Sequence, residues 1–500
     1  MENEQLIVST KKGKIRGFEE NNVNKWFGIP YAKPPVNQLR FKRAQEHEAW
    51  EDIKNCYQMG NRPYQFMDEK IVKLAGSDLP SSEDCLNLNV WAPKHAKKAP
   101  VFVWLYGGGN QMGEASLPIY FLDSFAKKGI IGVSFNYREG PLGFYNFSTL
   151  DKEFDSNCAV SDMVLAMHWV KDNIAAFGGD PDNITIAGES AGGTGVYALL
   201  TAPTAKGTFN KAISMSGLAK NITTQKMHDL NNEIFFEKLG IKATEAASLK
   251  EMPIEEMIPA AAATFSEINL RYPGAIISGP VIDDLLPQYP WEALAAGAGK
   301  DIPCIFGTCR DEGTLFMNDP MDLIPRSWDQ VAEMLSNNDQ LNKLPALKEI
   351  YQGLPEKKAI AKLGRDRLFW VDSIKCTLAQ SQHAATYSYR FDYASPVNKL
   401  LGFGARHGSE VQPALNTKID PQSKWQKIIP KPELKKIRDT MHGAFVNFAI
   451  TGDPNGGLSP NWPAYTKNSR ATFVINKKNH IEYDPTPQHF EVWKDIKLYE

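Results

Sequence analysis

Cysteine is scarce in this sequence and shows no regular spacing. Only six cysteines occur in 500 residues. Cys304 and Cys309 lie close together, but no second pair of cysteines or histidines nearby completes a zinc site. We therefore expect buried free thiols, with no disulfide framework and no metal or organic cofactor. A chain of this length can bury a large core without such cross-links.

The sequence also lacks long apolar segments and a large excess of either positive or negative charge. No segment is long and apolar enough to span a bilayer, and the first five residues, MENEQ, contain neither the basic region nor the apolar run of a secretory signal. The 56 basic and 58 acidic residues leave a net charge of −2, which gives no electrostatic reason to expect nucleic acid or an anionic membrane as a partner. We expect a cytoplasmic protein without membrane insertion.

One serine lies in a pattern typical of a catalytic nucleophile. Residues 183–187 are apolar and β-branched, as in a buried parallel strand, and the G-x-S-x-G turn from Gly188 to Gly192 follows with Ser190 at its centre. Such a turn holds a serine in strained backbone at the start of a helix, whose free N–H groups point toward the serine oxygen. A glycine-rich connection without chemistry is the alternative, because five-residue motifs also match by accident.

A glycine cluster follows a second predicted strand. Residues 100–106 (PVFVWLY) predict a central strand, which ends in Gly107-Gly108-Gly109. Three glycines at the carboxyl end of a parallel sheet leave backbone N–H groups unshielded, and such donors are what a developing oxyanion needs. On the residues alone, a flexible turn explains this cluster equally well.

The order of strand and helix patterns predicts an α/β fold with a large, mostly parallel central sheet and helices on both faces. One α/β domain with insertions can absorb the whole length, so we expect a single domain over 1–500. Strand signals are missing from about 221–272 and from about 319–382. We interpret both stretches as helical cap insertions that lie over the sheet and enclose a gorge.

A serine hydroxyl needs a base to take its proton, and the base needs a third group to fix its tautomer. In α/β hydrolases the order along the chain is serine, acid, histidine. Among the histidines after Ser190, His407 lies in a glycine-rich loop that can present a side chain into a cleft. The others lie before the candidate acids, before a strand, in a helix or near the end of the chain: His228, His383, His442, His480 and His489.

The candidate acids are Asp311 and Glu312, which follow a predicted strand at its carboxyl end. Spacing does not choose between them. A surface ion pair between Arg310 and Asp311 is the structural alternative, and it would contribute about 0–1 kcal/mol. Asp283 and Asp284 are weaker candidates because no glycine turn presents them.

Eight motifs extend the pattern over nearly the whole chain: FGIPYAKPP at 27–35, SEDCLNLNVW at 82–91, YGGG at 106–109, NYREGPLGF at 136–144, AAFGGDPDNITIAGESAGG at 175–193, GTCRDEGTLF at 307–316, HGSE at 407–410 and TGDPN at 451–455. With these motifs in this order, the chain resembles the type-B carboxylesterase family, the cholinesterase-like branch of the α/β-hydrolase fold. It resembles most closely the bacterial para-nitrobenzyl-esterase-like members.

The resemblance implies a catalytic triad of Ser190 as nucleophile, His407 as base and Glu312, rather than Asp311, as acid. It also implies an oxyanion hole formed by three backbone N–H groups, those of Gly108, Gly109 and Ala191. The implied reaction is a two-step acyl transfer, in which the serine attacks an ester carbonyl and water then hydrolyses the acyl-enzyme.

Three departures from the family pattern qualify this resemblance. Asn110 stands where the family usually has an aromatic residue, so the pocket wall or the oxyanion loop differs here. Pro63 stands where secreted members place the partner of Cys85, which implies an unpaired Cys85 and a reducing compartment. The segment between them has no tryptophan to hold a quaternary ammonium group by cation–π attraction, so choline esters are not expected as substrates.

The sequence therefore predicts a serine carboxylesterase that acts on small or medium uncharged esters. Phe369 and Trp370, in the second insertion, are candidates for the gorge lining, with ordinary packing as the alternative. A recognition protein on the same fold is a second hypothesis, although it predicts a broken triad. A third hypothesis is an amidase, thioesterase or lactonase, because these enzymes use the same set of catalytic residues. The sequence leaves open whether the protein is a monomer or a homodimer.

Overall fold

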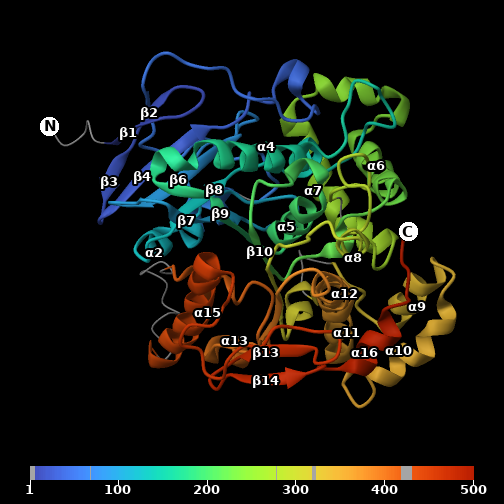
Figure 1. Cartoon of the computed structure of the whole chain (residues 1–500). Coiled ribbons are helices and arrows are strands. Elements are labelled where there is room, and N and C mark those ends of the chain that lie inside the picture. Colours follow the sequence, from blue (N-terminus) through green and yellow to red (C-terminus); the bar gives the residue numbers. More distant parts are fainter. Residues whose placement is uncertain (1–5, 68, 277–278, 318–322, 418–430) are drawn as a thin grey trace.

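A single large sheet runs through the centre of the molecule (Figure 1). The computed structural model describes residues 6–67, 69–276, 279–317, 323–417 and 431–500. Within these residues, eleven strands form the main sheet and three short strands near the N-terminus form a second one.

The central part of the main sheet is parallel, and its edges are antiparallel. From β13 to β8 the neighbouring strands are parallel, whereas β14, β6, β4 and β3 pair antiparallel with their neighbours. In order across the sheet the strands are β14 (His480–Tyr483), β13 (Ala471–Ile475), β12 (Thr386–Phe391), β11 (Cys304–Cys309), β10 (Lys211–Met215), β9 (Gly179–Glu189), β7 (Ala99–Leu105), β8 (Ile131–Phe135), β6 (Asn87–Pro93), β4 (Val23–Pro30) and β3 (Phe18–Glu20). The second sheet has the order β1 (Ile7–Ser9), β2 (Lys14–Arg16) and β5 (Lys54–Asn55).

The predicted sheet, mostly parallel and covered on both faces, is confirmed. Strand β7 is the clearest case, because its residues from Val101 to Leu105 are completely buried, as expected for a strand that is covered on both sides. Strands β13 and β14 extend the sheet beyond the elements predicted from the sequence. The apolar run of β13 has only five residues, and so short a run does not distinguish a strand from a buried helical segment.

Helices cover the two faces of the sheet (Figure 1). Helices α4 (Cys158–Asn173) and α5 (Ala191–Thr201) pack on one face, and α2 (Asp123–Ala126) and α15 (Lys431–Thr451) pack on the other. The shorter helices are α1 (Glu69–Leu74), η2 (Asn37–Leu39), η3 (Pro118–Tyr120), α3 (Gly140–Gly143), η4 (Ile174–Phe177), η5 (Pro203–Ala205), α13 (Pro396–Leu400), α14 (Val411–Leu415) and α16 (Pro487–Trp493).

Two long helical segments interrupt the alternation of strands and helices. The first lies between β10 and β11 and contains η6 (Ala219–Asn221), α6 (Gln225–Leu239), η7 (Ala243–Lys250), α7 (Ile254–Arg271) and α8 (Pro290–Ala295). The second lies between β11 and β12 and contains η8 (Glu312–Met317), α9 (Trp328–Ser336), η9 (Leu341–Lys343), α10 (Leu344–Ile350), α11 (Glu356–Arg365), η10 (Asp366–Trp370) and α12 (Val371–Gln380). Residues 319–322 of the second predicted cap lie outside the described residues. Side chains from both segments, such as Phe265 and Phe369, share one apolar core that is separate from the core of the sheet.

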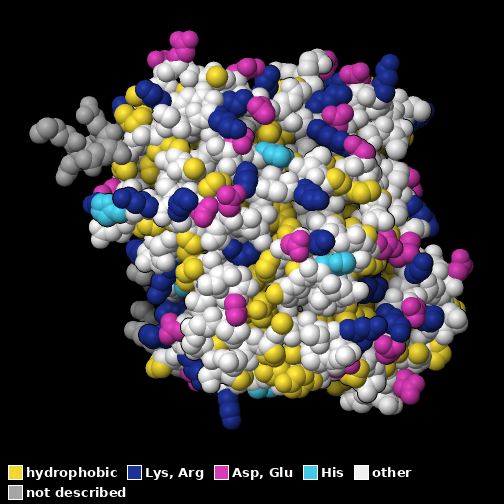
Figure 2. Space-filling view, viewed as in Figure 1, with side chains coloured by type: hydrophobic (Ala, Val, Ile, Leu, Met, Phe, Trp, Pro, Cys, Tyr) yellow, Lys and Arg dark blue, Asp and Glu magenta, His cyan; other side chains and the backbone are white. Residues whose placement is uncertain are grey.

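The surface carries mixed charge. On the face shown in Figure 2, basic and acidic side chains are interspersed over most of the surface. Of the helices that the structure describes, none is both long and apolar enough to cross a membrane. All six cysteines are buried and unpaired, which confirms the expectation of free thiols, including that of Cys85.

Candidate active site

Ser190 stands between β9 and α5 in strained backbone. Its φ of 58° and ψ of −123° lie in a region that side chains other than glycine rarely adopt. The flanking glycines are required by close contacts, because a Cβ at Gly188 would lie 2.4 Å from the carbonyl oxygen of Gly192, and one at Gly192 would lie 2.2 Å from that of Leu105. The turn therefore fixes the serine at the carboxyl end of the sheet and at the N-terminus of α5.

The glycine turn after β7 lies beside Ser190. Gly109 has a φ of 66°, and a Cβ at Gly108 would lie 1.8 Å from the carbonyl oxygen of Met112. Both glycines line one cavity together with Ser190 and Ala191. Within the described residues, the backbone N–H groups of Gly108, Gly109 and Ala191 donate no hydrogen bond to the protein. These three groups are available to an oxygen atom of a ligand.

Glu312 and His407 are in direct contact, although 95 positions separate them. The Nδ1 atom of His407 lies 2.6 Å from Oε2 of Glu312, whose side chain is fully buried. The second carboxylate oxygen, Oε1, accepts a hydrogen bond of 2.6 Å from the backbone N–H of Cys309 and one of 2.7 Å from the hydroxyl of Ser216. Glu312 is therefore an acceptor in every one of these contacts, as an ionised carboxylate is.

The other candidate acids have different partners. Asp311 accepts a hydrogen bond of 2.8 Å from the backbone N–H of Ala405 and pairs with Arg310, so it joins the two loops that carry Glu312 and His407. The more distant acidic pair, Asp283 and Asp284, contacts Arg43. Among the other histidines, His383 and His442 bind backbone carbonyl oxygens, those of Ala295 and Ala414.

Ser190 and His407 line the same cavity but are not hydrogen-bonded to each other. The described hydrogen bonds of Ser190 involve only its backbone. The other ring nitrogen of His407, Nε2, lies 3.4 Å from Oε1 of Glu189. Active sites without substrate often hold the nucleophile and its base slightly apart, and the bond forms when the substrate binds.

Buried carboxyl groups set the protonation of this site. Burial, opposed by the charge of His407 and reinforced by the carboxylates of Glu410 and Glu312, raises the pKa of Glu189 to about 8. For His407, burial lowers the pKa, but the carboxylates of Glu189, Glu312 and Glu410 outweigh this effect and raise the pKa to about 9. A carboxylate beside the ring stabilises the imidazolium form, so the net effect of these surroundings is to raise the pKa of His407.

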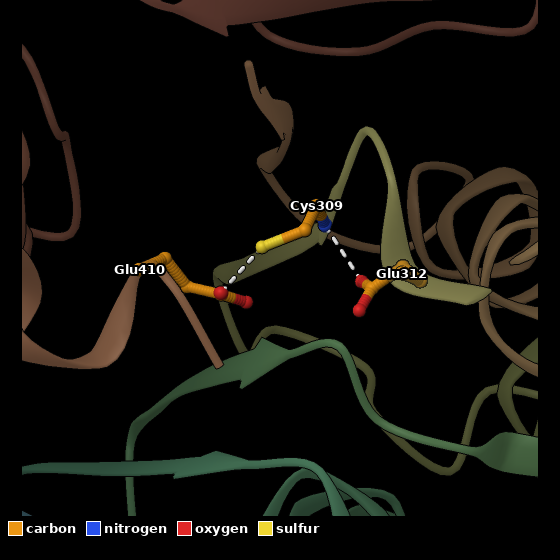
Figure 3. Close-up of side chains that lie close together, drawn as sticks. All are labelled: Cys309, Glu312 and Glu410. Atoms are coloured by element: carbon orange, nitrogen blue, oxygen red, sulfur yellow. Dashed lines mark hydrogen bonds between the residues drawn. The ribbon is translucent and has the colours of Figure 1, made fainter. Parts of the chain in front are cut away.

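A buried hydrogen-bond network lies behind Glu312 (Figure 3). The thiol of Cys309 points at the carboxyl group of Glu410, and the backbone nitrogen of the same cysteine points at Glu312. The hydroxyl of Ser216 contacts one oxygen of Glu410 and one oxygen of Glu312. A hydroxyl has one hydrogen, so Ser216 donates to one of these carboxyl groups and must accept from the other.

Proton counting identifies Glu410 as the neutral carboxyl group. Besides Ser216, Glu312 contacts two donors, the ring of His407 and the backbone N–H of Cys309, so it takes the Ser216 hydrogen as well. Glu410 must then carry the proton that it donates to Ser216. Burial and the charge of Glu312 raise the pKa of Glu410, in agreement with this assignment. The chain of donors runs from Cys309 through Glu410 and Ser216 to Glu312.

Cys309, Glu312 and Glu410 also have the spacing of a possible metal site, since their ligand atoms lie within 4.8 Å of one another. These groups are hydrogen-bonded to one another instead: the thiol of Cys309 contacts Glu410, and its backbone N–H donates to Glu312. We interpret this group as a hydrogen-bond network that supports Glu312.

The cavity in front of Ser190 is mostly apolar and has a volume of about 290 Å³. The described residues that line it come from the sheet, from both helical segments and from the His407 loop: Met67, Gly107, Gly108, Gly109, Met112, Gly113, Leu117, Tyr120, Glu189, Ser190, Ala191, Leu218, Asn221, Phe265, Ile276, Leu315, Phe316, Leu323, Leu368, Phe369, His407 and Gly408. Such a cavity can bury the carbon skeleton of a small ligand beside a few polar groups.

The three predicted pocket residues are placed differently. Phe369 lines the cavity, and its ring lies 4.6 Å from that of His407. Trp370 is the next residue on η10 but packs against Phe490 and Arg365, outside the described lining. Asn110 is buried behind the glycine turn, where its backbone oxygen accepts a hydrogen bond of 2.8 Å from Gly140, and it is not part of that lining either.

Sequence reasoning assigned no role to Glu189, Ser216 or Glu410. Two of them stand in the motifs: Glu189 is one of the two variable residues of the G-x-S-x-G turn, and Glu410 ends the HGSE motif. A charged residue that is fully buried beside a reactive group is a candidate for function. Burial, however, is decided by the tertiary structure.

Comparison with known proteins identifies the family. The model of the carboxylesterase family matches residues 4–493. The chain belongs to the carboxylesterase family. It is 36% identical over 490 residues to the para-nitrobenzyl esterase of Bacillus subtilis (strain 168), with 96% of both chains covered. It is 31% identical to the phenmedipham hydrolase of Pseudarthrobacter oxydans, with 94% of both chains covered.

Solved structures of carboxylesterases have the same fold. A thermophilic PNB esterase superposes with a TM-score of 0.86 at 34% identity, covering 97% of this chain and 99% of that one. A carboxylesterase of Geobacillus stearothermophilus superposes with a TM-score of 0.83 at 32% identity, covering 98% and 100%. The fold is therefore the α/β-hydrolase fold, and the protein is a carboxylic ester hydrolase, as the sequence predicts.

Proposed function

We propose that this carboxylesterase uses Ser190 as nucleophile, His407 as general base and Glu312 as the acid that orients the histidine. The observation that supports the proposal most strongly is the 2.6 Å contact between Glu312 and His407, because His407 lines the same cavity as the strained Ser190. Glu312 fixes the proton on Nδ1, so Nε2 is free to take the serine proton.

The reaction then follows in two steps. Ser190 attacks the ester carbonyl while His407 takes its proton, and the oxyanion that forms accepts hydrogen bonds from the backbone N–H groups of Gly108, Gly109 and Ala191. His407 passes the proton to the departing alcohol. In the second step His407 takes a proton from water, whose oxygen attacks the acyl carbonyl. The bond to the Ser190 oxygen breaks, His407 returns its proton to that oxygen, and the carboxylic acid leaves.

Small or medium uncharged esters are the proposed substrates. The lining around Ser190 is mostly apolar, and Phe265, Phe316 and Phe369 offer aromatic surface to a substrate. The similarity to a para-nitrobenzyl esterase supports benzyl-type esters as candidates. Among the described lining residues there is no tryptophan, the residue that best attracts a quaternary ammonium group.

The domain organisation and the cellular setting belong to the same proposal. We propose one domain over 1–500, in which helical caps at about 221–272 and 319–382 contribute Phe265 and Phe369 to the cavity. A cytoplasmic location is supported by the six buried free thiols. The balanced charge argues against nucleic acid as a partner.

Matched substrates test this function. We expect steady hydrolysis of p-nitrophenyl acetate and butyrate and no measurable hydrolysis of the corresponding p-nitroanilides. The kcat/KM for a neutral butyrate ester should exceed that for butyrylcholine by about tenfold or more, because the described lining is mostly apolar and offers no tryptophan ring to a quaternary ammonium group. Faster cleavage of the anilides, or a preference for the choline ester, would contradict the proposal.

The pH dependence of kcat/KM tests the role of the carboxyl groups around His407. The base must be neutral to accept a proton, so activity rises with pH through the pKa of His407. Because that pKa is raised to about 9, we expect the midpoint of the rise above the 6.5 of an unperturbed imidazole. Glu189→Gln removes a carboxylate that favours the imidazolium form, so the midpoint should move to lower pH.

The control for this pH experiment is Glu251→Gln, which removes an exposed carboxylate far from the site in sequence and should leave the profile unchanged. Rates are measured with p-nitrophenyl butyrate from pH 5 to pH 10, with a correction for spontaneous hydrolysis. An equal midpoint in wild type and Glu189→Gln would show that Glu189 does not set the pKa of the base.

The neutral state of Glu410 makes a specific prediction. Glutamine has the same shape and can accept from Cys309 and donate to Ser216, as a protonated carboxyl group does. Glu410→Gln should therefore retain kcat/KM within about threefold. Glu410→Ala removes the donor to Ser216 and leaves the thiol of Cys309 without its acceptor, so it should lower kcat/KM by about tenfold or more. Glu312→Gln and Glu312→Ala are the comparison for a carboxylate that is ionised. Both should lower kcat/KM strongly, because a neutral glutamine does not replace the negative charge. Equal loss in Glu410→Gln and Glu410→Ala would mean that Glu410 works as a carboxylate.

A further inference from the structure

A second cavity of about 580 Å³ lies on the surface beside α11 and α13 and shares no described lining residue with the cavity of Ser190. Its described lining contains six basic side chains and a single acidic one: Arg310, Lys358, Lys362, Arg365, Arg390 and Lys399, with Asp311. This excess of one sign stands out in a chain whose total charge is nearly balanced.

The arginines of this cavity are already paired. Arg310 contacts Asp311 at 2.9 Å, and Arg365 contacts Asp366. Arg390 is paired twice, with Asp392 at 2.7 Å and with Glu482 at 2.8 Å.

The three lysines are different. Lys358, Lys362 and Lys399 have no ion-pair partner among the described residues. Six basic groups therefore face four acidic groups when the partners of the arginines are included, and two positive charges are left over.

Lys362 shows the effect of this imbalance. Its side chain is half-buried on α11 and lies close to the guanidinium groups of Arg365 and Arg390. Burial lowers its pKa, and Arg365 and Arg390 lower it further, against the opposing effect of Asp366. A bound anion would stabilise the protonated form of Lys362, because its negative charge offsets the positive charges around this side chain.

We propose that this cavity is a binding site for a small oligoanion, a phosphate ester or a polycarboxylate with two or more negative charges. The size fits a small molecule, since ligand cavities commonly measure about 300–1,000 Å³. Three ammonium groups that have no ion-pair partner within the described part of the chain suit an anion that carries several oxygens, because each oxygen can accept a hydrogen bond from one of them.

The position of the cavity links it to the active site. Arg310 and Asp311 directly precede Glu312, and Gly402 and Gly404 belong to the loop that leads to His407. The hydroxyl of Thr314 lies 2.7 Å from the backbone oxygens of both Asp311 and Phe403, so the two loops meet in the wall of the cavity. A bound anion would cross-link these loops from outside, and we expect it to raise the thermal stability of the protein.

Titration calorimetry of the full-length protein with pyrophosphate, in a buffer without phosphate or citrate, tests the site. We expect saturable binding of one anion per chain, weakened by added KCl because screening reduces attraction between exposed charges. Citrate is titrated in parallel, and the tighter of the two anions indicates whether phosphate esters or polycarboxylates are the natural class. Failure of both anions to bind would overturn the proposal.

Paired variants localise the binding. Lys358→Gln/Lys362→Gln removes two charges from the cavity, and Lys206→Gln/Lys300→Gln removes two exposed charges elsewhere on the surface. The first variant should bind the anion about tenfold more weakly for each lysine removed, because each removal costs one hydrogen-bonded charge pair. The second variant should bind the anion as tightly as wild type.

Equal loss in both double variants would mean unspecific attraction and would overturn the site. Folding is checked by circular dichroism and by hydrolysis of p-nitrophenyl butyrate. If the cavity double variant does not fold, Lys399→Gln makes the same test with a single exposed residue. Because binding is measured directly, the outcome does not depend on the proposed catalytic roles.

Discussion

Replacing Ser190 by alanine is expected to lower kcat/KM for p-nitrophenyl butyrate by about 10⁴- to 10⁶-fold, the range seen when a serine hydrolase loses its nucleophile. The hydroxyl is the atom that forms the acyl-enzyme, so no other group in the cavity replaces it. Binding and the oxyanion donors remain, and they account for any residual rate above that of water.

The fold should tolerate this substitution. The strained backbone at residue 190 is imposed by contacts of Gly188 and Gly192 and by the hydrogen bond from the Ser190 N–H to Met215. Alanine has the same Cβ as serine, so the unfolding midpoint should change little. The matched control is Ser336→Ala, an exposed serine at the end of α9, which should retain wild-type turnover.

Activity is measured with stopped-flow and steady-state absorbance, and the acyl-enzyme is detected by mass spectrometry after a quench with acid. A Ser190→Ala protein that is folded and still turns over p-nitrophenyl butyrate at the wild-type rate would refute the proposed nucleophile. It would equally refute the assignment of His407 and Glu312, whose roles depend on it.

The second large effect concerns stability. Arg138 and Asp162 form a buried ion pair, with exposures of 2% and 0%. The guanidinium group donates two hydrogen bonds, of 2.9 Å and 2.6 Å, to the carboxylate, and the backbone N–H of Arg138 donates a third of 3.1 Å. The pair joins the segment after β8 to the first turns of α4.

Asp162→Ala is expected to lower the free energy of unfolding by about 3–5 kcal/mol, because it leaves the Arg138 charge buried without its partner. Asp439→Ala is the matched control, since it breaks an ion pair with Lys435 in which both side chains are 60% exposed or more. That exposed pair lies one turn apart on a helix and should contribute about 0.3–0.5 kcal/mol.

Urea unfolding followed by tryptophan fluorescence gives both values, with refolding checked by recovery of esterase activity. Destabilisation of equal size in Asp162→Ala and Asp439→Ala would contradict this interpretation of the buried pair. The double variant Arg138→Met/Asp162→Leu removes both charges and should be more stable than Asp162→Ala alone.

The sequence by itself determined the features that depend on local physics. The G-x-S-x-G sequence alone predicts a tight turn from strand to helix with Ser190 at its centre. Apolar strands in alternation with helices predict a parallel sheet covered on both faces. The loop around His407 was also recognisable, since glycines on both sides free a side chain from regular structure.

Only the tertiary structure distinguished groups that look equivalent along the chain. Asp311 and Glu312 are adjacent after the same strand, and spacing did not choose between them. In the fold, Glu312 is buried against His407, while Asp311 binds Arg310 and the backbone of Ala405. The family resemblance implied the same choice, but the physical reason is the position of the His407 loop.

The same limit applies to the residues that sequence reasoning did not find. Ser216 and Glu410 are 194 positions apart and meet because β10 ends beside the loop that precedes α14. Phe369 and Trp370 are neighbours in the sequence, yet the turn of η10 directs one toward His407 and the other toward Phe490. Periodicity and motifs describe one segment at a time, whereas burial and proton sharing arise only when distant segments come together.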